Sequence, residues 1–198
     1  CLDLVWNGLD RPEQVRFAKA LLVIADKQQK AWRFSDVSNQ IYTNSGKNIL
    51  IGLALAGANV DPAKEQFYMR QAEDLIRNHL VPASNFWAAD DGGWGEGHGY
   101  CDFTMKDWAL EAHAWASATG EDLFQEANFF KFLSQWRVYQ RRYNGTLAKF
   151  NDSAEGSVRV PFPAHIASRW RDRMAQKQAK DELARAMANP DDFSVTHL

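Results

Sequence analysis

The chain contains a glycine-rich stretch, DDGGWGEGHGY, at residues 90–100, in which glycines alternate with side chains that can do chemistry. Glycine lets the backbone adopt positive φ and approach a ligand closely. A helix is expected directly after the stretch, and the free N–H groups of a helix N-terminus favour anions. We therefore expect Glu96, His98 and Tyr100 to meet an anionic ligand at one place. The alternative is a solvated glycine loop in which Trp94 fills the core.

Metal binding is a second interpretation of this stretch. Glu96, His98, Cys101 and Asp102 are all side chains that can bind a metal ion. Their spacing matches no zinc pattern, such as paired cysteines or two histidines four residues apart. The sequence therefore predicts neither a metal nor another cofactor.

A second candidate group lies in IYTNSGKN, residues 41–48, where Asn44 and Asn48 are one helical turn apart. An amide can stabilise the charge that develops next to a carboxylate when the adjacent carbon loses a proton. An asparagine here can equally cap a helix. The residues alone leave both roles open for Asn44, and they make Asn48 a candidate substrate-binding residue.

Two tryptophans and one arginine could also contact a ligand. Trp87 and Trp94 lie in the segment 83–102, which we expect to be a long loop, so we assign both rings to a cleft in which they stack on sugars. Arg159 lies in a second expected loop, 145–162, and is assigned to substrate binding; an ordinary turn is the alternative. Loops of this length in a compact helical domain are usually functional.

The elements that must position these residues are helices, because start and stop signals recur along the chain. These signals predict four helices, which begin at Asp10, near Asn44, at Asp61 and at Thr104. The third of these helices should end before Pro82, and the fourth should end at Gly120. Further helices are expected in 121–143 and over Pro163–Ala188, and Trp108 and Trp115 fall on a buried stripe. The only candidate strand is SVRV, at 157–160. The predicted fold class is all-α, built from helical hairpins with little or no sheet; periodicity fits a bundle or a toroid.

Composition excludes several classes of protein. Of the 198 residues, 45% are hydrophobic and 24% are charged, which is typical of a globular domain rather than of a disordered chain. The net charge of −2 argues against nucleic acid as the main partner. No apolar run is long enough to span a membrane. We expect a single helical domain over 1–198, cut from a longer protein.

Several segments, taken in order, resemble the heparinase II/III-like polysaccharide lyases. They are LVWNGLDRPEQ, Asn44 with the apolar helix after it, DDGGWGEGHGY before an aromatic helix, and FNDS. The most specific is the run Asp-Gly-Gly-Trp-x-Glu-Gly-x-x-Tyr. The resemblance implies that the chain is an incomplete (α/α) toroid, followed in the longer protein by a β-sandwich domain. It also implies an acidic polysaccharide as partner and a periplasmic or secreted location.

Catalytic roles follow from the same resemblance. Tyr100 corresponds to the base and acid of a β-elimination, while Asn44 and Glu96 correspond to residues that neutralise the uronate carboxylate and so acidify the C5 proton. His98 lies inside the matching run at a variable position and completes the set of catalytic candidates.

Two other functions remain open at this stage. An inverting glycoside hydrolase would need two carboxylates about 6.5–9.5 Å apart, which Asp91, Glu96 and Asp102 could supply. A glycan-binding or scaffold domain without catalysis would keep its affinity for sugar when the Tyr100 hydroxyl is removed.

Overall fold

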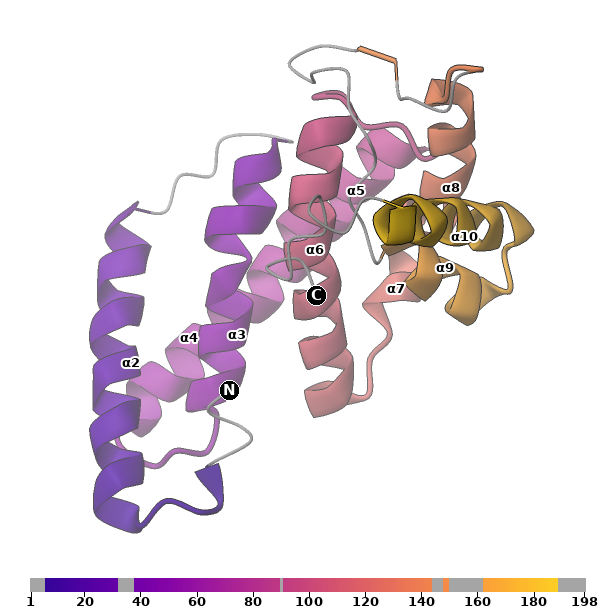
Figure 1. Ribbon diagram of the computed structural model, residues 1–198. Coiled ribbons are helices and arrows are strands. Elements are labelled where there is room, and N and C mark those ends of the chain that lie inside the picture. Colours follow the sequence, from indigo (N-terminus) through magenta and orange to yellow (C-terminus); the bar gives the residue numbers. More distant parts are fainter. Residues whose placement is uncertain (1–5, 32–37, 90, 144–147, 150–161, 189–198) are drawn as a thin grey trace. The chain divides into compact units, whose positions relative to one another are not determined.

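The computed structural model is all-α (Figure 1) and describes residues 6–31, 38–89, 91–143, 148–149 and 162–188. Of these described residues 80% are helical and none belongs to a strand, which confirms the predicted fold class. The chain divides into two compact units: 1–83 with 107–123 form the first, and 84–106 with 124–198 form the second. The candidate strand at 157–160 lies outside the described residues.

Helix α2 (Arg11–Ala31), in the first unit, begins as the sequence predicts. The Asp10 carboxylate accepts a hydrogen bond from the Glu13 N–H at 2.9 Å, and the Glu13 carboxylate accepts one from the Asp10 N–H at 3.2 Å. This reciprocal pair is a capping box, which satisfies N–H groups that have no partner within the helix.

Two further helices, α3 (Lys47–Leu55) and α4 (Pro62–Leu75), pack against each other, and α2 packs on α3 (Figure 1). The start of α4 is also as predicted, since Asp61 accepts a hydrogen bond from the Lys64 N–H at 3.1 Å. A shared core holds these helices together and contains Ala18, Leu22, Ala25, Leu55, Ala58 and Tyr68.

One carboxylate on α2 adds polar contacts to α4. Asp26 accepts hydrogen bonds from the Lys64 ammonium at 2.6 Å and from the Tyr68 hydroxyl at 2.5 Å. Burial raises the pKa of the Tyr68 hydroxyl, and the bond to Asp26 raises it further. The tyrosine therefore stays protonated and remains the donor in this contact.

The prediction that the helix from Asp61 ends before Pro82 is wrong. After α4 the chain widens into a π-helical turn, η2 (Ile76–Leu80), and continues as α5 (Val81–Ala88). A proline inside an α-helix clashes with the carbonyl four residues earlier, which here belongs to Asn78 in η2. The wider π turn directly before Pro82 accommodates the ring, so the helix passes through it.

The aromatic helix, α6 (His98–Thr119), begins before the predicted cap at Thr104, which is fully buried inside it. The chain enters the helix directly from Gly97, whose φ is +84°. Its predicted end is confirmed, because Gly120 has φ +80° and donates its N–H to the Ala116 carbonyl at 2.9 Å. The predicted burial of Trp108 and Trp115 is also confirmed.

The second unit contains four more helices among its described residues. They are α7 (Leu123–Glu126), α8 (Asn128–Gln140), α9 (Phe162–Trp170) and α10 (Arg173–Ala188). The single helix predicted over Pro163–Ala188 is thus two helices. Arg171 interrupts it with φ +52°, and Asp172 then caps α10 by accepting a hydrogen bond from the Met174 N–H at 2.8 Å.

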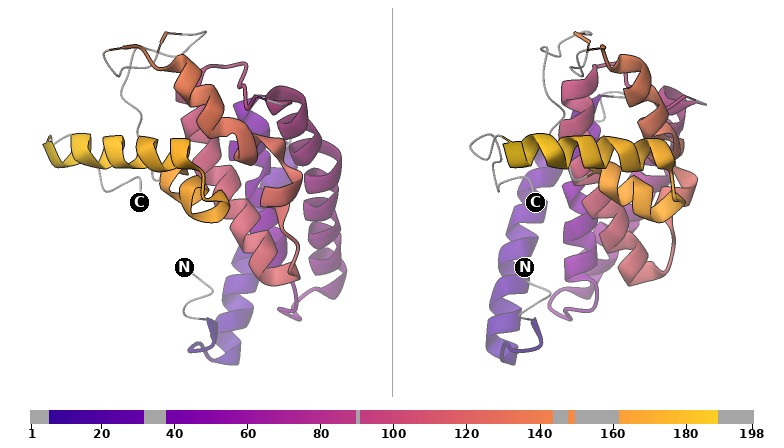
Figure 2. Two further views of the ribbon diagram at one scale, coloured as in Figure 1. Left: turned by 90° about the vertical axis from the view of Figure 1, so that its right-hand side faces the viewer. Right: turned by 45° about the vertical axis from the view of Figure 1, so that its right-hand side comes forward.

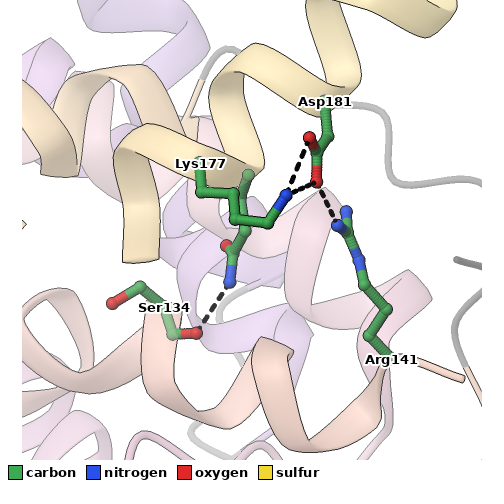
Figure 3. Close-up of polar contacts among 5 residues, drawn as sticks. Ser134, Arg141, Lys177 and Asp181 are labelled. Atoms are coloured by element: carbon green, nitrogen blue, oxygen red, sulfur yellow. Dashed lines mark hydrogen bonds and ion pairs between the residues drawn. The ribbon is translucent and has the colours of Figure 1, made fainter. Parts of the chain in front are cut away.

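Helix α10 packs on α9 and α8 (Figure 2). Two polar contacts between α10 and the α8 region are shown in Figure 3. The Gln178 amide donates a hydrogen bond to the Ser134 carbonyl at 2.8 Å, and the Asp181 carboxylate binds Arg141 at 2.7 Å. Lys177 reaches the same carboxylate at 3.2 Å, so two cations share one anion.

Candidate functional site

The glycine-rich stretch forms a tight turn over 91–97, between α5 and α6. Gly92 has φ +79°, and a side chain there would overlap the backbone of Phe132 in α8. A side chain at Gly95 would overlap the ring of Trp87. The glycines are therefore required by backbone conformation and by close packing of the turn, whatever the chemistry beside them.

The three candidate side chains of this turn and of the start of α6 differ in their exposure to solvent. Glu96 is half-buried, His98 is only 6% exposed, and Tyr100 is 39% exposed. Residues two positions apart on an α-helix point about 200° apart, so His98 and Tyr100 face different sides of α6. The accessible candidates in this unit are thus Tyr100 and Glu96, and a ligand shared by the two stays a prediction.

Neither Trp87 nor Trp94 lies in the long loop where we expected both rings to stack on sugars. Trp94 is 2% exposed and meets Phe129 edge-on at a ring-centroid distance of 5.3 Å, so its faces are covered by core side chains. Its burial corrects the stacking assignment and agrees with the alternative in which Trp94 fills the core. Trp87 belongs to the last turn of α5 rather than to a loop, is half-buried, and contacts the exposed Phe86.

Asn44 does not cap a helix, because it lies inside a π-helical turn, η1 (Ile41–Ser45). Helix α3 instead follows Gly46, which provides no side-chain hydrogen bond. The Asn44 side chain is exposed, whereas Asn48, in the first turn of α3, is only 5% exposed. The structure thus excludes the capping role for Asn44. It also shows that Asn48, which was predicted to bind substrate, is buried. Short π-helical turns occur often at functional sites.

The candidates belong to different parts of the chain. Asn44 lies in the first unit, and Glu96, His98 and Tyr100 lie in the second, so their convergence on one surface stays a prediction. Arg159 lies outside the described residues, as does the FNDS segment.

A buried ion pair, which the sequence analysis did not find, lies next to the turn. Arg137 on α8 is 3% exposed and pairs with Asp102 on α6. Burial raises the pKa of the neighbouring Cys101 thiol to about 12, although Arg137 partly opposes the rise. Cys101 is therefore a protonated core residue, and Asp102 is bound to a cation inside the fold. Neither residue is placed as a metal ligand, and no group of three metal-binding side chains occurs in the described parts of the chain.

A buried carboxyl group in the first unit also escaped the sequence analysis. Glu111 on α6 is 1% exposed, and neither of its carboxyl oxygens has a hydrogen-bond partner among the residues that the structure describes. Burial raises its pKa well above the usual value, Asp107 raises it further, and Lys47 opposes the rise. Glu111 therefore keeps its proton to a higher pH than an exposed glutamate does. Its spacing from Trp108 and Trp115 puts it on the buried stripe, which is the signal that could have identified it.

The turn η1 is held by Tyr42, which also lies near Glu111. The Tyr42 hydroxyl donates a hydrogen bond to the Leu80 carbonyl in η2 at 2.9 Å, and its ring packs on Trp108 at 5.6 Å. Burial raises the pKa of the hydroxyl, and the charge of Glu111 raises it further. Tyr42 is therefore a structural donor that connects the two π turns, rather than a candidate base.

Comparisons with protein-family models, curated proteins and solved structures give no significant match. The established result is therefore an all-helical protein without an assigned family. In the described residues, no helix combines the length and the apolar character that crossing a membrane requires.

Proposed function

We propose that this chain is a carbohydrate-active helical domain that serves in β-elimination on acidic, uronate-containing polysaccharides. The observation that supports this most is the position of Tyr100. Its side chain is 39% exposed in the first turn of α6, directly after the tight turn that carries Glu96. A phenol at a helix N-terminus, four residues from a carboxyl group on a fixed turn, suits proton transfer at a bound anion.

The proposed reaction assigns one step to each group. The Tyr100 oxygen removes the C5 proton of the uronate, the electrons form a C4–C5 double bond, and the C4–O4 bond breaks. Tyr100 then returns the proton to O4 of the leaving sugar. Asn44, with Glu96, acts on the uronate carboxyl group, because hydrogen bonds to the charge that develops there lower the barrier. Their exposed and half-buried side chains are compatible with contact to a large substrate.

The finer architecture belongs to the same proposal. An (α/α) toroid, a β-sandwich domain elsewhere in the longer protein and a periplasmic or secreted location all rest on the resemblance to heparinase II/III-like lyases. Helical hairpins such as α3 with α4 and α9 with α10 are compatible with a toroid, and they are equally compatible with other helical folds.

The hydrolase alternative is less favoured by the contacts of Asp102. A general acid or base must be free to exchange a proton with the substrate, and Asp102 is paired with the buried Arg137. That leaves Asp91 and Glu96 as the candidate carboxylates of such an enzyme, and both lie in the described turn.

Product chemistry tests the proposal. The intact protein that contains this chain should be incubated with uronate polysaccharides, some sulfated and some not, and with neutral glucans as controls. We expect an unsaturated uronate that absorbs in the ultraviolet, from the uronate substrates only. New reducing ends without absorbance would indicate hydrolysis, and binding without either product would indicate a non-catalytic glycan-binding domain.

A further inference from the structure

One backbone N–H group in the first unit is shared between two helical registers. The Gly46 N–H donates a hydrogen bond to the Ile41 carbonyl at 3.0 Å and another to the Tyr42 carbonyl at 3.1 Å. The bond to Ile41 spans five residues, as in a π-helix, and the bond to Tyr42 spans four, as in an α-helix. The turn η1 therefore ends between the two registers, so a contact to one of these carbonyls can decide which register is kept.

The carboxyl group of Glu111, on α6, lies against this end of the turn. A side chain at Gly46 would overlap both carboxyl oxygens of Glu111 and also the Tyr42 carbonyl oxygen, so the three oxygens lie around one position. Glu111 is 1% exposed, and neither of its carboxyl oxygens has a hydrogen-bond partner among the described residues. Its two oxygens are thus buried beside a carbonyl that belongs to the shared hydrogen bond.

The protonation state of Glu111 decides whether this arrangement is stable. A protonated carboxyl group has an O–H that can donate to a carbonyl, whereas a carboxylate can only accept. A carboxylate and a carbonyl oxygen therefore repel each other, and the repulsion is strong where burial keeps water away. The contact favours the protonated form of Glu111 and would be broken by the ionised form.

We propose that Glu111 is a positioning residue that holds η1 in its shared register while it is protonated and displaces the turn when it loses its proton to solvent. The displaced Tyr42 carbonyl no longer shares the Gly46 N–H, which then keeps only its bond to Ile41. Asn44, which lies inside η1, moves with the turn. An effect on elimination rests on the proposed role of Asn44, but the movement of the turn does not.

Three ionisable side chains interact with Glu111 among the described residues, and they set the pH at which it ionises. Burial raises the pKa of Glu111 most, Asp107 on α6 raises it further, and Lys47 at the start of α3 opposes the rise. The third is Tyr42 on η1, whose hydroxyl pKa is raised by burial and by the charge of Glu111. The tyrosine thus keeps its proton, and the proton lost first in this group is that of Glu111.

NMR spectra of the full chain between pH 4 and 9 test the proposal, because an amide proton shift depends on the carbonyls that accept its hydrogen bond. We expect the amides of Asn44 and Gly46 to shift together, with a midpoint above the usual range of a glutamate. Glu111→Gln should remove this transition, since an amide can donate to a carbonyl but cannot ionise. Constant shifts in the wild type, or the same transition in Glu111→Gln, would overturn the proposal.

Two surface variants should move the midpoint in opposite directions. Lys47 is exposed and Asp107 is half-buried, so the fold should be retained when either is changed. Lys47→Gln should raise the midpoint and Asp107→Asn should lower it, while Glu73→Gln, on the exposed side of α4, should leave it unchanged. Equal midpoints in all three variants would show that another group titrates. The measurement contains no polysaccharide, so its result is independent of whether the chain acts in β-elimination.

Discussion

A side chain at Gly46 would overlap both carboxyl oxygens of Glu111. The two residues meet where η1 joins α3, so the space left by the glycine is the space that the buried carboxyl group occupies. The Tyr42 carbonyl lies equally close to Gly46. Because this junction lies between Asn44 and Asn48, the contact of Gly46 with Glu111 sets the position of both asparagines relative to α6.

Gly46→Ala should destabilise the protein by about 1–3 kcal/mol, the usual cost of overpacking a filled core. Urea unfolding measures the change in the free energy of unfolding. In a Glu111→Ala background the same substitution should cost less, by at least about 0.5 kcal/mol, because one of the two overlaps is gone. Equal costs in both backgrounds would show that the two residues do not interact.

Glu111→Gln should stabilise the protein at neutral and alkaline pH. The pKa of Glu111 is raised in the folded state by burial, so between the unfolded and folded pKa values the folded state binds more protons. Stability therefore falls as pH rises through this window, by up to about 1.4 kcal/mol per pH unit. An amide cannot ionise, so the variant should lose this dependence, which Tm measurements from pH 4 to 9 would reveal.

The matched control is Glu73→Gln, which changes an exposed glutamate of α4. It should retain the wild-type dependence of Tm on pH. If Glu111→Gln follows the same curve as wild type and control, the buried carboxyl group does not titrate as described.

Removing Arg137 should be far more costly than removing an exposed cation. Arg137→Met leaves the Asp102 carboxylate, 15% exposed, without its cation, and breaking such a pair typically costs about 3–5 kcal/mol. Lys64→Met breaks a pair whose side chains are 44% and 43% exposed, and its effect on stability should be far smaller, because water screens exposed charges. The double variant Asp102→Leu with Arg137→Met should be more stable than Arg137→Met alone, and the opposite order would contradict this account.

The sequence predicted the start or end of a helix correctly only where a capping side chain or a glycine with positive φ marks that end locally. Asp10, Asp61 and Gly120 are of this kind, and all three were predicted correctly. Pro82 was misread as a stop because the π turn that accommodates it has no local sequence pattern. The break at Arg171 was missed for a similar reason, since a non-glycine residue with positive φ is held there by its surroundings.

The candidate site was predicted only in part. Tyr100 and Asn44 are exposed as their proposed roles require, but Trp94 and Asn48 are buried. Alternation of glycine with polar residues does not reveal which side chains point inward, because that depends on α8 packing against the turn. Glu111 was missed because the buried stripe was assigned from its apolar residues alone, although the spacing of Glu111 from Trp108 and Trp115 places it on the same stripe.

Asn44→Ala should leave stability almost unchanged, within about 0.5 kcal/mol, because the exposed side chain lies in η1 and caps no helix. Thermal unfolding measures this directly. The same variant should slow uronate elimination if Asn44 assists the developing charge. A loss of stability near 1 kcal/mol, typical of a lost N-cap, would restore the capping role.

The most direct test of the proposed function is the elimination rate of Tyr100→Phe in the intact protein, measured by ultraviolet absorbance beside the affinity for the same polysaccharide. The substitution removes one hydroxyl and keeps the ring, whose position in the first turn of α6 is 39% exposed. We predict a rate lower by about 10²–10⁴-fold, as expected for loss of a general acid–base group, with affinity nearly unchanged. Full activity of Tyr100→Phe would contradict the assignment, and His98 would then be the first residue to test as the proton shuttle.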